Sequence, residues 1–263
     1  MRCKKCNARL AAHDIWCMSC GSQSPIVKTE LSAMASLRAS YEKLQGKWSE
    51  YVPVSSIAII LGLIPIMGLL YILNFVISLD NTSDIQYLLN LIVKSILFGI
   101  FVPMVLLPFS KIGNHRDYSL ILGSVADFIK PYGRYLIFSL INALYFVLIH
   151  IICFGLPGFA SDPILRLVWI VLLNYWVAIV LPVPVLMEHK QINPLRAILL
   201  SYRHFHDLRW NIYLLALVLV GLNALAFILA VFPLLFTLPL SYFAIRDYTL
   251  KLIDYQLLEH RIV

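Results

Sequence analysis

Four cysteines near the start of the chain are the residues whose types and spacing most clearly allow chemistry. Cys3 and Cys6 form one Cys-x2-Cys pair, Cys17 and Cys20 form a second, and ten residues separate the two pairs. Four thiolates arranged in two such pairs match the ligand set of a tetrahedral four-cysteine zinc site. Because thiolates would fill all four positions, the site is expected to hold a structural ion rather than a catalytic one.

The residue after each pair supports a tight turn. Asn7 follows the first pair and Gly21 follows the second, and both types tolerate the left-handed backbone conformation that such a turn requires. Two disulfides would instead need an oxidising compartment, and a redox motif would need a βαβ pattern around the cysteines. Residues 1–21 resemble the short zinc ribbon at the start of many bacterial and archaeal proteins, and without metal so short a segment would be unfolded.

The composition of the rest of the chain determines its class. Of the 263 residues, 60% are hydrophobic and 13% are charged, whereas a soluble domain averages roughly 45–50% apolar and about 25% charged residues. The chain also contains several uncharged runs longer than the ~20 residues that cross a bilayer. These features exclude a soluble fold and predict an all-α polytopic membrane protein.

Six transmembrane helices are predicted. Four are expected at 52–78 (with a bend at Pro65), 85–110, 135–157 and 164–187. No charge occurs over 211–245, which is too long for one span, so two short helices should meet near Phe232 and Pro233. The expected organisation is a zinc ribbon at 1–21, an amphipathic linker helix at 22–50 and a membrane domain at 51–263. The apolar face of the linker would comprise Leu31, Met34, Leu37, Tyr41 and Leu44.

The distribution of basic residues predicts the orientation of these helices. With six spans, 19 of the 21 Lys and Arg residues fall in the termini and in the two loops on the same side. The positive-inside rule then places both termini in the cytoplasm of a bacterial inner-membrane protein, which agrees with reduced, metal-bound cysteines. The net charge of +7 is accounted for by topology and by contact with anionic lipid headgroups, so no nucleic-acid partner is expected.

Two stretches of the membrane domain resemble each other. Residues 140–146 read LINALYF and residues 221–227 read GLNALAF, which aligns Asn142 with Asn223; the same offset aligns Pro103 with Pro184. This pattern indicates a parallel internal duplication. Each copy also contains a basic cytoplasmic segment with apolar residues at helical spacing, at 118–132 and at 195–205. These segments are expected to be interfacial helices that lie flat on the membrane or pack against the bundle.

The second half of this region also resembles known membrane families. LPVPVLMEHKQINPLRAILLSYRHFHDLRWNIYLL, followed by FPLLFTLPLSYFAIRDYTLKLI, is similar to YciC-like bacterial inner-membrane proteins and to the membrane domain of some glycerophosphodiester phosphodiesterases. The resemblance implies six helices with an internal duplication and a final motif that corresponds here to Thr237, Pro239 and Tyr248. It implies an architecture more than an activity, and the zinc ribbon is an addition to the family pattern.

Three polar residues inside the predicted spans form a candidate intramembrane site. Lys94 lies within the second span, where a charge is a functional candidate by default. Its side chain could line a polar cavity or snorkel toward Asp80, Asp84 or Asp162. Asn142 and Asn223 could bind a solute, but hydrogen bonding between helices is the more general role of such residues.

The sequence contains no phosphate-binding loop, metalloprotease motif, serine-hydrolase motif or pair of intramembrane carboxylates. We therefore expect a non-enzymatic scaffold, assembly or regulatory factor that acts through its zinc ribbon. Its expected partners are the lipid bilayer and a membrane or cytoplasmic protein, and self-association into a homo-oligomer stays open. A transport component for a small solute or lipid is the alternative, and a membrane enzyme acting on lipid is the third hypothesis.

Overall fold

The structure is a computed structural model, and its helices confirm the predicted all-α class beyond the cysteine-rich head. The described part of the chain comprises residues 3, 5–9, 16–22, 31–77, 84–114, 125–154, 163–229 and 232–255. The chain divides into two compact units, which we describe separately. The first contains Met1–Trp48, Val177–Ile192 and Arg196–Val263, and the second contains Ser49–Trp176 and Asn193–Leu195.

Five helical stretches in the described part of the chain are long and apolar enough to cross a membrane, with mean hydropathies of 2.2 to 2.5. They are Trp48–Leu73, Gln86–Ser110, Pro131–Phe154, Pro163–His189 and Trp210–Ile228. Large apolar side chains stay exposed along them, such as Tyr71, Ile152 and Leu167. Lipid-facing side chains have this property, because lipid tails are as apolar as the side chains themselves. The protein is therefore a helical membrane protein.

The first span of the second unit is continuous but locally deformed. Helix α3 (Trp48–Ala58) leads through a π-helical turn, η1 (Ile59–Leu63), into α4 (Ile64–Ile77). The sequence predicted a bend at Pro65, and the irregular turn ends two residues before this proline. Since proline has no backbone N–H, it cannot complete the helical hydrogen bond to the preceding turn, and a π-turn is one way for the chain to accommodate it.

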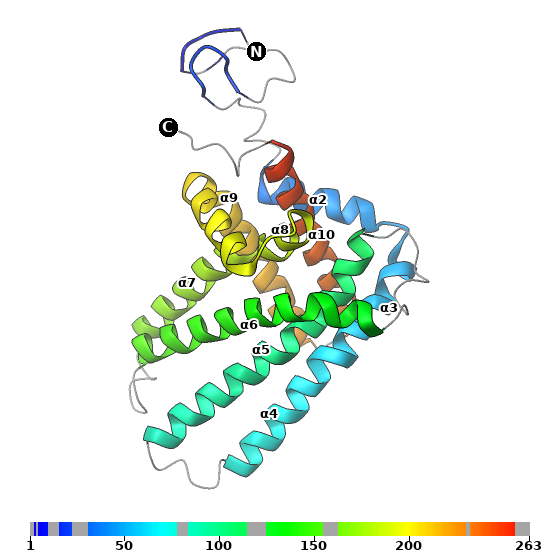
Figure 1. The fold of residues 1–263 in the computed structure, drawn as a ribbon, viewed down its shortest axis with the longest axis vertical. Coiled ribbons are helices and arrows are strands. Elements are labelled where there is room, and N and C mark those ends of the chain that lie inside the picture. Colours follow the sequence, from blue (N-terminus) through cyan, green and yellow to red (C-terminus); the bar gives the residue numbers. More distant parts are fainter. Residues whose placement is uncertain are drawn as a thin grey trace. The chain divides into compact units, whose positions relative to one another are not determined.

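The remaining helices of this unit pack through small residues. They are α5 (Asp84–Asn114), α6 (Val125–Phe154) and α7 (Pro163–Val180), with α5 lying along α6 (Figure 1). A Cβ atom at Gly99 of α5 would come within 2.9 Å of the Leu140 side chain of α6, and one at Gly62 would meet Val105 of α5. Glycine thus permits the close helix approach that is common in membrane bundles.

The first unit has its own core around the last helix. It contains α2 (Ala33–Leu44), α8 (Val183–His189), most of α9 (Pro194–Ile228) and α10 (Leu234–Asp254), and α10 packs against both α2 and α8. Its fully buried side chains come from all four helices and include Leu44, Leu186, Ile212, Tyr248 and Leu252.

Helix α2 buries only part of the face that the sequence predicted, namely Leu44 and, just before the helix, Leu31. Met34 and Tyr41, which were assigned to its apolar face, are 65% and 53% exposed. Besides Leu44, the buried residues of the helix are Ala33, Ser36 and Ser40. Their spacing of three and four residues still defines one side of a helix. Most of them are small, and small side chains let the backbone of α2 approach α10 closely.

The two basic segments expected to lie flat on the membrane are continuous with the spans that follow them. Residues 125–132 form the first turns of α6, and 195–205 form the first turns of α9; residues 118–124 lie outside the described part of the chain. The expectation of separate interfacial helices is therefore wrong for the described residues. Once a helix is nucleated, each added residue gains a hydrogen bond at little further cost. In α9 the one proline is Pro194 at its start, and α6 continues through Pro131.

The predicted turn between the last two helices is present, but α10 is not among the five apolar stretches. The helix begins directly after Phe232 and Pro233. Its second half contains Arg246, Asp247 and Lys251, which leaves 234–245 as its uncharged part. Twelve residues of helix extend only about 18 Å, against a hydrocarbon thickness of about 30 Å. Six spans therefore stay a prediction.

Candidate metal centre

The four cysteine sulfur atoms of the head lie within 4.8 Å of one another. Two of the separations join one cysteine pair to the other, at 3.5 Å from Cys3 to Cys20 and 3.4 Å from Cys6 to Cys17. A tetrahedral thiolate site with metal–sulfur bonds of about 2.3 Å has sulfur–sulfur edges of about 3.8 Å. Disulfide bonds would need about 2.05 Å. The cluster thus has the dimensions of a metal site, and all four cysteines are free thiols.

Each cysteine pair sits on a tight turn of the predicted kind. Asn7 and Gly21 have positive φ angles of 60° and 66°. The Asn7 N–H donates to the Cys3 carbonyl at 2.9 Å, and the Gly21 N–H donates to the Cys17 carbonyl at 2.7 Å. Both residue types adopt this conformation more readily than others do. The left-handed residue therefore closes each turn and directs both thiols of a pair to the same side.

A second hydrogen bond shows that the two turns are copies of one local structure. The Cys3 N–H donates to the Ala8 carbonyl at 2.9 Å, and the Cys17 N–H donates to the Ser22 carbonyl at 2.8 Å. Ala8 and Ser22 thus occupy equivalent positions, each two residues after the second cysteine of its pair. The difference between their side chains affects the site directly.

The Ser22 hydroxyl lies between two of the sulfur atoms. Its oxygen is 2.9 Å from Cys3 Sγ and 3.0 Å from Cys20 Sγ. A thiolate can only accept, so the hydroxyl is the donor when the sulfurs are ionised. Sequence reasoning missed this residue. The signal available to it was the repeated order Cys-x2-Cys-Asn-Ala and Cys-x2-Cys-Gly-Ser, which places an alanine and a serine in matching positions.

The electrostatics of the cluster favour a bound cation. The hydrogen bond from Ser22 lowers the pKa of the Cys3 thiol to about 6 and also lowers the pKa of Cys20. The backbone hydrogen bond at Ala8 acts to lower the pKa of Cys6, but the neighbouring thiols, Cys20 first, raise it to about 12. Four close sulfurs cannot all ionise without a positive charge among them. A cation removes this conflict.

All four candidate ligands of the cluster are cysteines. Among the residues that the structure describes, it is the one group of three or more His, Cys, Asp or Glu side chains able to hold a metal ion. Cys3 and Cys17 are buried, whereas Cys6 is exposed. Four protein ligands leave no open position for a substrate or water, and this arrangement is typical of structural sites.

Lys94, the candidate charge in the membrane, lies on α5 with a half-buried side chain. The acidic residues proposed as its snorkelling partners lie outside the described part of the structure, Asp80 and Asp162 entirely and Asp84 with its side chain. Both interpretations of Lys94, snorkelling and a polar cavity, stay predictions.

Asn142 and Asn223 both make hydrogen bonds between helices. The Asn142 oxygen accepts from the Trp176 indole N–H at 2.7 Å, which joins α6 to α7. Asn223 joins α9 to α10 twice: its oxygen accepts from Thr237 at 3.0 Å, and its amide donates to Ser241 at 2.7 Å. Each amide also donates to the backbone carbonyl four residues earlier. The two asparagines thus act as cross-links, each to the helix that follows its own.

A polar pair in the second unit was not predicted. The Tyr87 hydroxyl of α5 lies 2.6 Å from His150 Nε2 of α6, and the His150 ring is also close to the rings of Phe154 and Trp169. The two residues are 63 positions apart in the sequence, so no local pattern could have joined them.

Comparison with known proteins adds no assignment. No family model, curated protein or solved structure matches this chain.

Proposed function

We propose that the protein is a non-enzymatic scaffold, assembly or regulatory factor of a bacterial inner membrane, with a zinc-bound head that contacts a protein partner. The observation that carries this proposal is the four-cysteine cluster at one end of a chain whose remainder is built from membrane helices. A closed thiolate site stabilises a surface instead of performing chemistry. A small folded surface held at a membrane is suited to recruiting or positioning a partner.

Zinc is the ion proposed for the head. Soft thiolate ligands select zinc, copper(I) or iron–sulfur clusters, and a tetrahedral set of four sulfurs favours zinc or iron. Two Cys-x2-Cys pairs on tight turns are typical of structural zinc sites. Among the described residues of the head, the buried cluster consists of Cys3 and Cys17, with Ala8 and Cys20 packed against them. Metal binding would therefore supply most of the folding free energy of the head.

We also propose six spans with both termini in the cytoplasm. The sixth would be α10, with its uncharged part 234–245 in the bilayer and its charged end among headgroups or in the cytoplasm. The 19 of 21 basic residues that this topology places inside support it. The internal duplication, and with it the YciC-like resemblance, stays part of the proposal. The matching interhelical roles of Asn142 and Asn223 support a duplication.

Removal of the head tests the proposal. A chain lacking residues 1–21, and the variant Cys3→Ser/Cys17→Ser, should lose the proteins that cross-link to the full-length protein in native membranes. Cys153→Ser is the matched control, since this buried cysteine lies on α6 outside the cluster. All variants should resist carbonate extraction, because membrane helices satisfy their own backbone hydrogen bonds. A headless chain that retains every partner would refute the scaffold proposal.

A transport component is the second candidate, favoured by a row of polar groups on α5. Tyr87, Asn90 and Lys94 follow a spacing of three and four residues, so they share one side of the helix. The buried Asn90 Oδ1 has no hydrogen-bond partner among the described residues. Lys94→Met should abolish the activity of a transporter and leave a scaffold unaffected. Loss of the cellular phenotype with Lys94→Met, while the headless chain keeps it, would reverse the order of the two candidates.

A further inference from the structure

A small pocket lies between α2 and α10, away from the cysteine cluster in sequence. Its volume is about 90 Å³, several times the ~10–15 Å³ needed for one water molecule on this measure. Ser40 and Lys43 line it from α2; Phe243, Arg246 and Asp247 line it from α10. The pocket is therefore located where the uncharged part of α10 gives way to its charged end.

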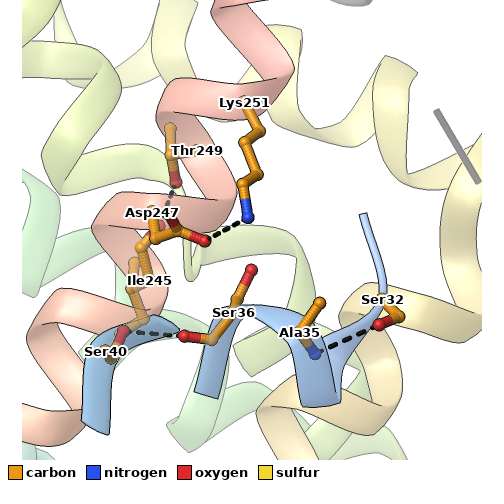
Figure 2. A network of polar contacts seen from close by, with 8 residues as sticks. All are labelled: Ser32, Ala35, Ser36, Ser40, Ile245, Asp247, Thr249 and Lys251. Carbon is orange, nitrogen blue, oxygen red and sulfur yellow. Dashed lines mark hydrogen bonds and ion pairs between the residues drawn. The ribbon is translucent and has the colours of Figure 1, made fainter. Parts of the chain in front are cut away.

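The charges at this pocket are unbalanced. Asp247, the one acidic residue in its lining, is already paired with Lys251 one turn later, at 2.8 Å (Figure 2). Lys43 lies over the Phe243 ring, with its ammonium nitrogen 4.7 Å from the ring centre. Lys43 and Arg246 thus bring two positive charges to one pocket. The carboxylate of Asp247, which could balance them, is paired with a third cation, Lys251.

The position of Lys43 is electrostatically unfavourable without an anion. Burial lowers the pKa of Lys43, and the nearby Arg246 lowers it further, while Asp247 only partly opposes them. Two cations held together in a partly desolvated pocket repel each other more strongly than they would in water. Occupation by an anion would convert this repulsion into two charge-assisted hydrogen bonds.

Close to this pocket, one hydroxyl group on α2 lacks a hydrogen-bond partner. Ser36, one turn before Ser40, is fully buried, and its hydroxyl oxygen has no hydrogen-bond partner among the described residues. Figure 2 shows this hydroxyl directed toward the side of α10 that carries Asp247 and Lys251. The Ser40 hydroxyl, in contrast, donates to the Ser36 carbonyl at 2.7 Å. A buried hydroxyl without a partner is destabilising, so a polar species between the helices would stabilise this arrangement.

We propose that the pocket between α2 and α10 binds a phosphate group through Lys43 and Arg246. The ammonium and the guanidinium supply donors of the two kinds that recognise phosphate in proteins. This step rests on the topology proposed above, in which α10 is the sixth span: the pocket borders the uncharged part of α10 and so lies at headgroup depth, which makes an anionic lipid its natural source. Basic pockets between helices on the cytoplasmic side bind lipid headgroups in this manner.

The test uses the full-length protein in a zwitterionic detergent and two probes, a short-chain phosphatidylglycerol and inorganic phosphate. Short-chain phosphatidylcholine serves as the net-neutral lipid control. Saturable binding of phosphatidylglycerol but not of free phosphate assigns the site to a lipid headgroup. Binding of both probes with similar dissociation constants assigns it to a soluble phosphate. Absence of binding by either probe, or equal binding of phosphatidylcholine and phosphatidylglycerol, overturns the proposal.

Variants localise the binding to the pocket. Lys43→Met keeps the apolar stem over Phe243 and removes the charge, and Arg246→Gln removes the second cation; each should raise the dissociation constant at least tenfold. Arg38→Gln is the matched control, because it removes the same charge from α2 at a side chain that is 82% exposed. An equal loss of binding with Arg38→Gln would show a diffuse surface effect and contradict the proposal. Lys43→Arg should retain binding, which separates charge from folding.

Discussion

Ser22→Ala is the substitution that probes the head most selectively. It removes one hydroxyl that lies 2.9 Å from Cys3 Sγ and 3.0 Å from Cys20 Sγ. The backbone hydrogen bond from the Cys17 N–H to the Ser22 carbonyl does not involve the side chain and should persist. The four sulfur ligands are unchanged, so any effect on metal affinity comes from the lost donor.

Two independent magnitudes bound the effect. A hydrogen bond to a charged group contributes about 1.5–3 kcal/mol. Loss of a residue that supports metal ligands typically lowers metal affinity about 10- to 100-fold, which corresponds to about 1.4–2.7 kcal/mol. A hydroxyl carries one proton and serves one sulfur at a time, so only one such bond is lost. We therefore expect Ser22→Ala to weaken zinc binding about 10- to 100-fold while retaining one ion per chain.

The assay is a competition titration of the purified full-length protein against a chromophoric zinc chelator at constant pH. The equivalent position in the first turn provides the converse experiment. Ala8→Ser places a hydroxyl where the repeat of the turn directs it toward Cys6 and Cys17, and it should strengthen zinc binding about three- to tenfold. Wild-type affinity in Ser22→Ala would refute the assigned role of this hydroxyl, and weaker binding in Ala8→Ser would refute the equivalence of the two turns.

Three further predictions concern the helices and the metal. Asn223→Leu should destabilise the bundle about twice as much as Asn142→Leu, because it loses two interhelical hydrogen bonds instead of one. Each such bond contributes about 0.6 kcal/mol in membranes, and unfolding in mixed micelles measures the difference. Gly62→Val should reduce folded yield in the same assay, whereas Gly68→Val, at a position with open space around it, should not. Chelation should expose the thiols of the head to alkylation at constant helical circular dichroism, because only the head depends on metal.

The metal cluster and the membrane class could be predicted from local sequence signals. The cysteine spacing and the residues at Asn7 and Gly21 directly specify two tight turns. Uncharged runs of span length need no tertiary information to be recognised, and five of the six predicted spans coincide with apolar helices. The turn at Phe232 and Pro233 was also predictable, because one helix could not hold so long an uncharged run.

Other features depend on contacts that a single sequence does not reveal. The buried face of α2 consists mainly of small residues such as Ser36 and Ser40, and a hydropathy pattern assigns such residues to the solvent side. Their burial follows from the close approach of α10. The pairing of Tyr87 with His150 depends on the register of α5 against α6. No periodicity in either helix determines that register.

The basic segments were predicted as separate helices for a related reason. Amphipathic spacing in 195–205 suits both a helix lying on a membrane and the first turns of a longer helix. Pro194 begins α9, and the helix then continues without a break to Ile228. Only a helix-breaking residue would separate the basic segment 195–205 from the span that follows it, and no such residue lies between them.

The central claim is that the cysteine head is a structural zinc site. Zinc K-edge X-ray absorption of the purified full-length protein, together with its metal content, tests this claim most directly. We expect one zinc per chain, coordinated by four sulfurs at about 2.3 Å, with no open coordination position. Absence of zinc in protein that retains its membrane fold, a mass that shows two disulfides, or a shell containing nitrogen or oxygen in place of sulfur would contradict the account.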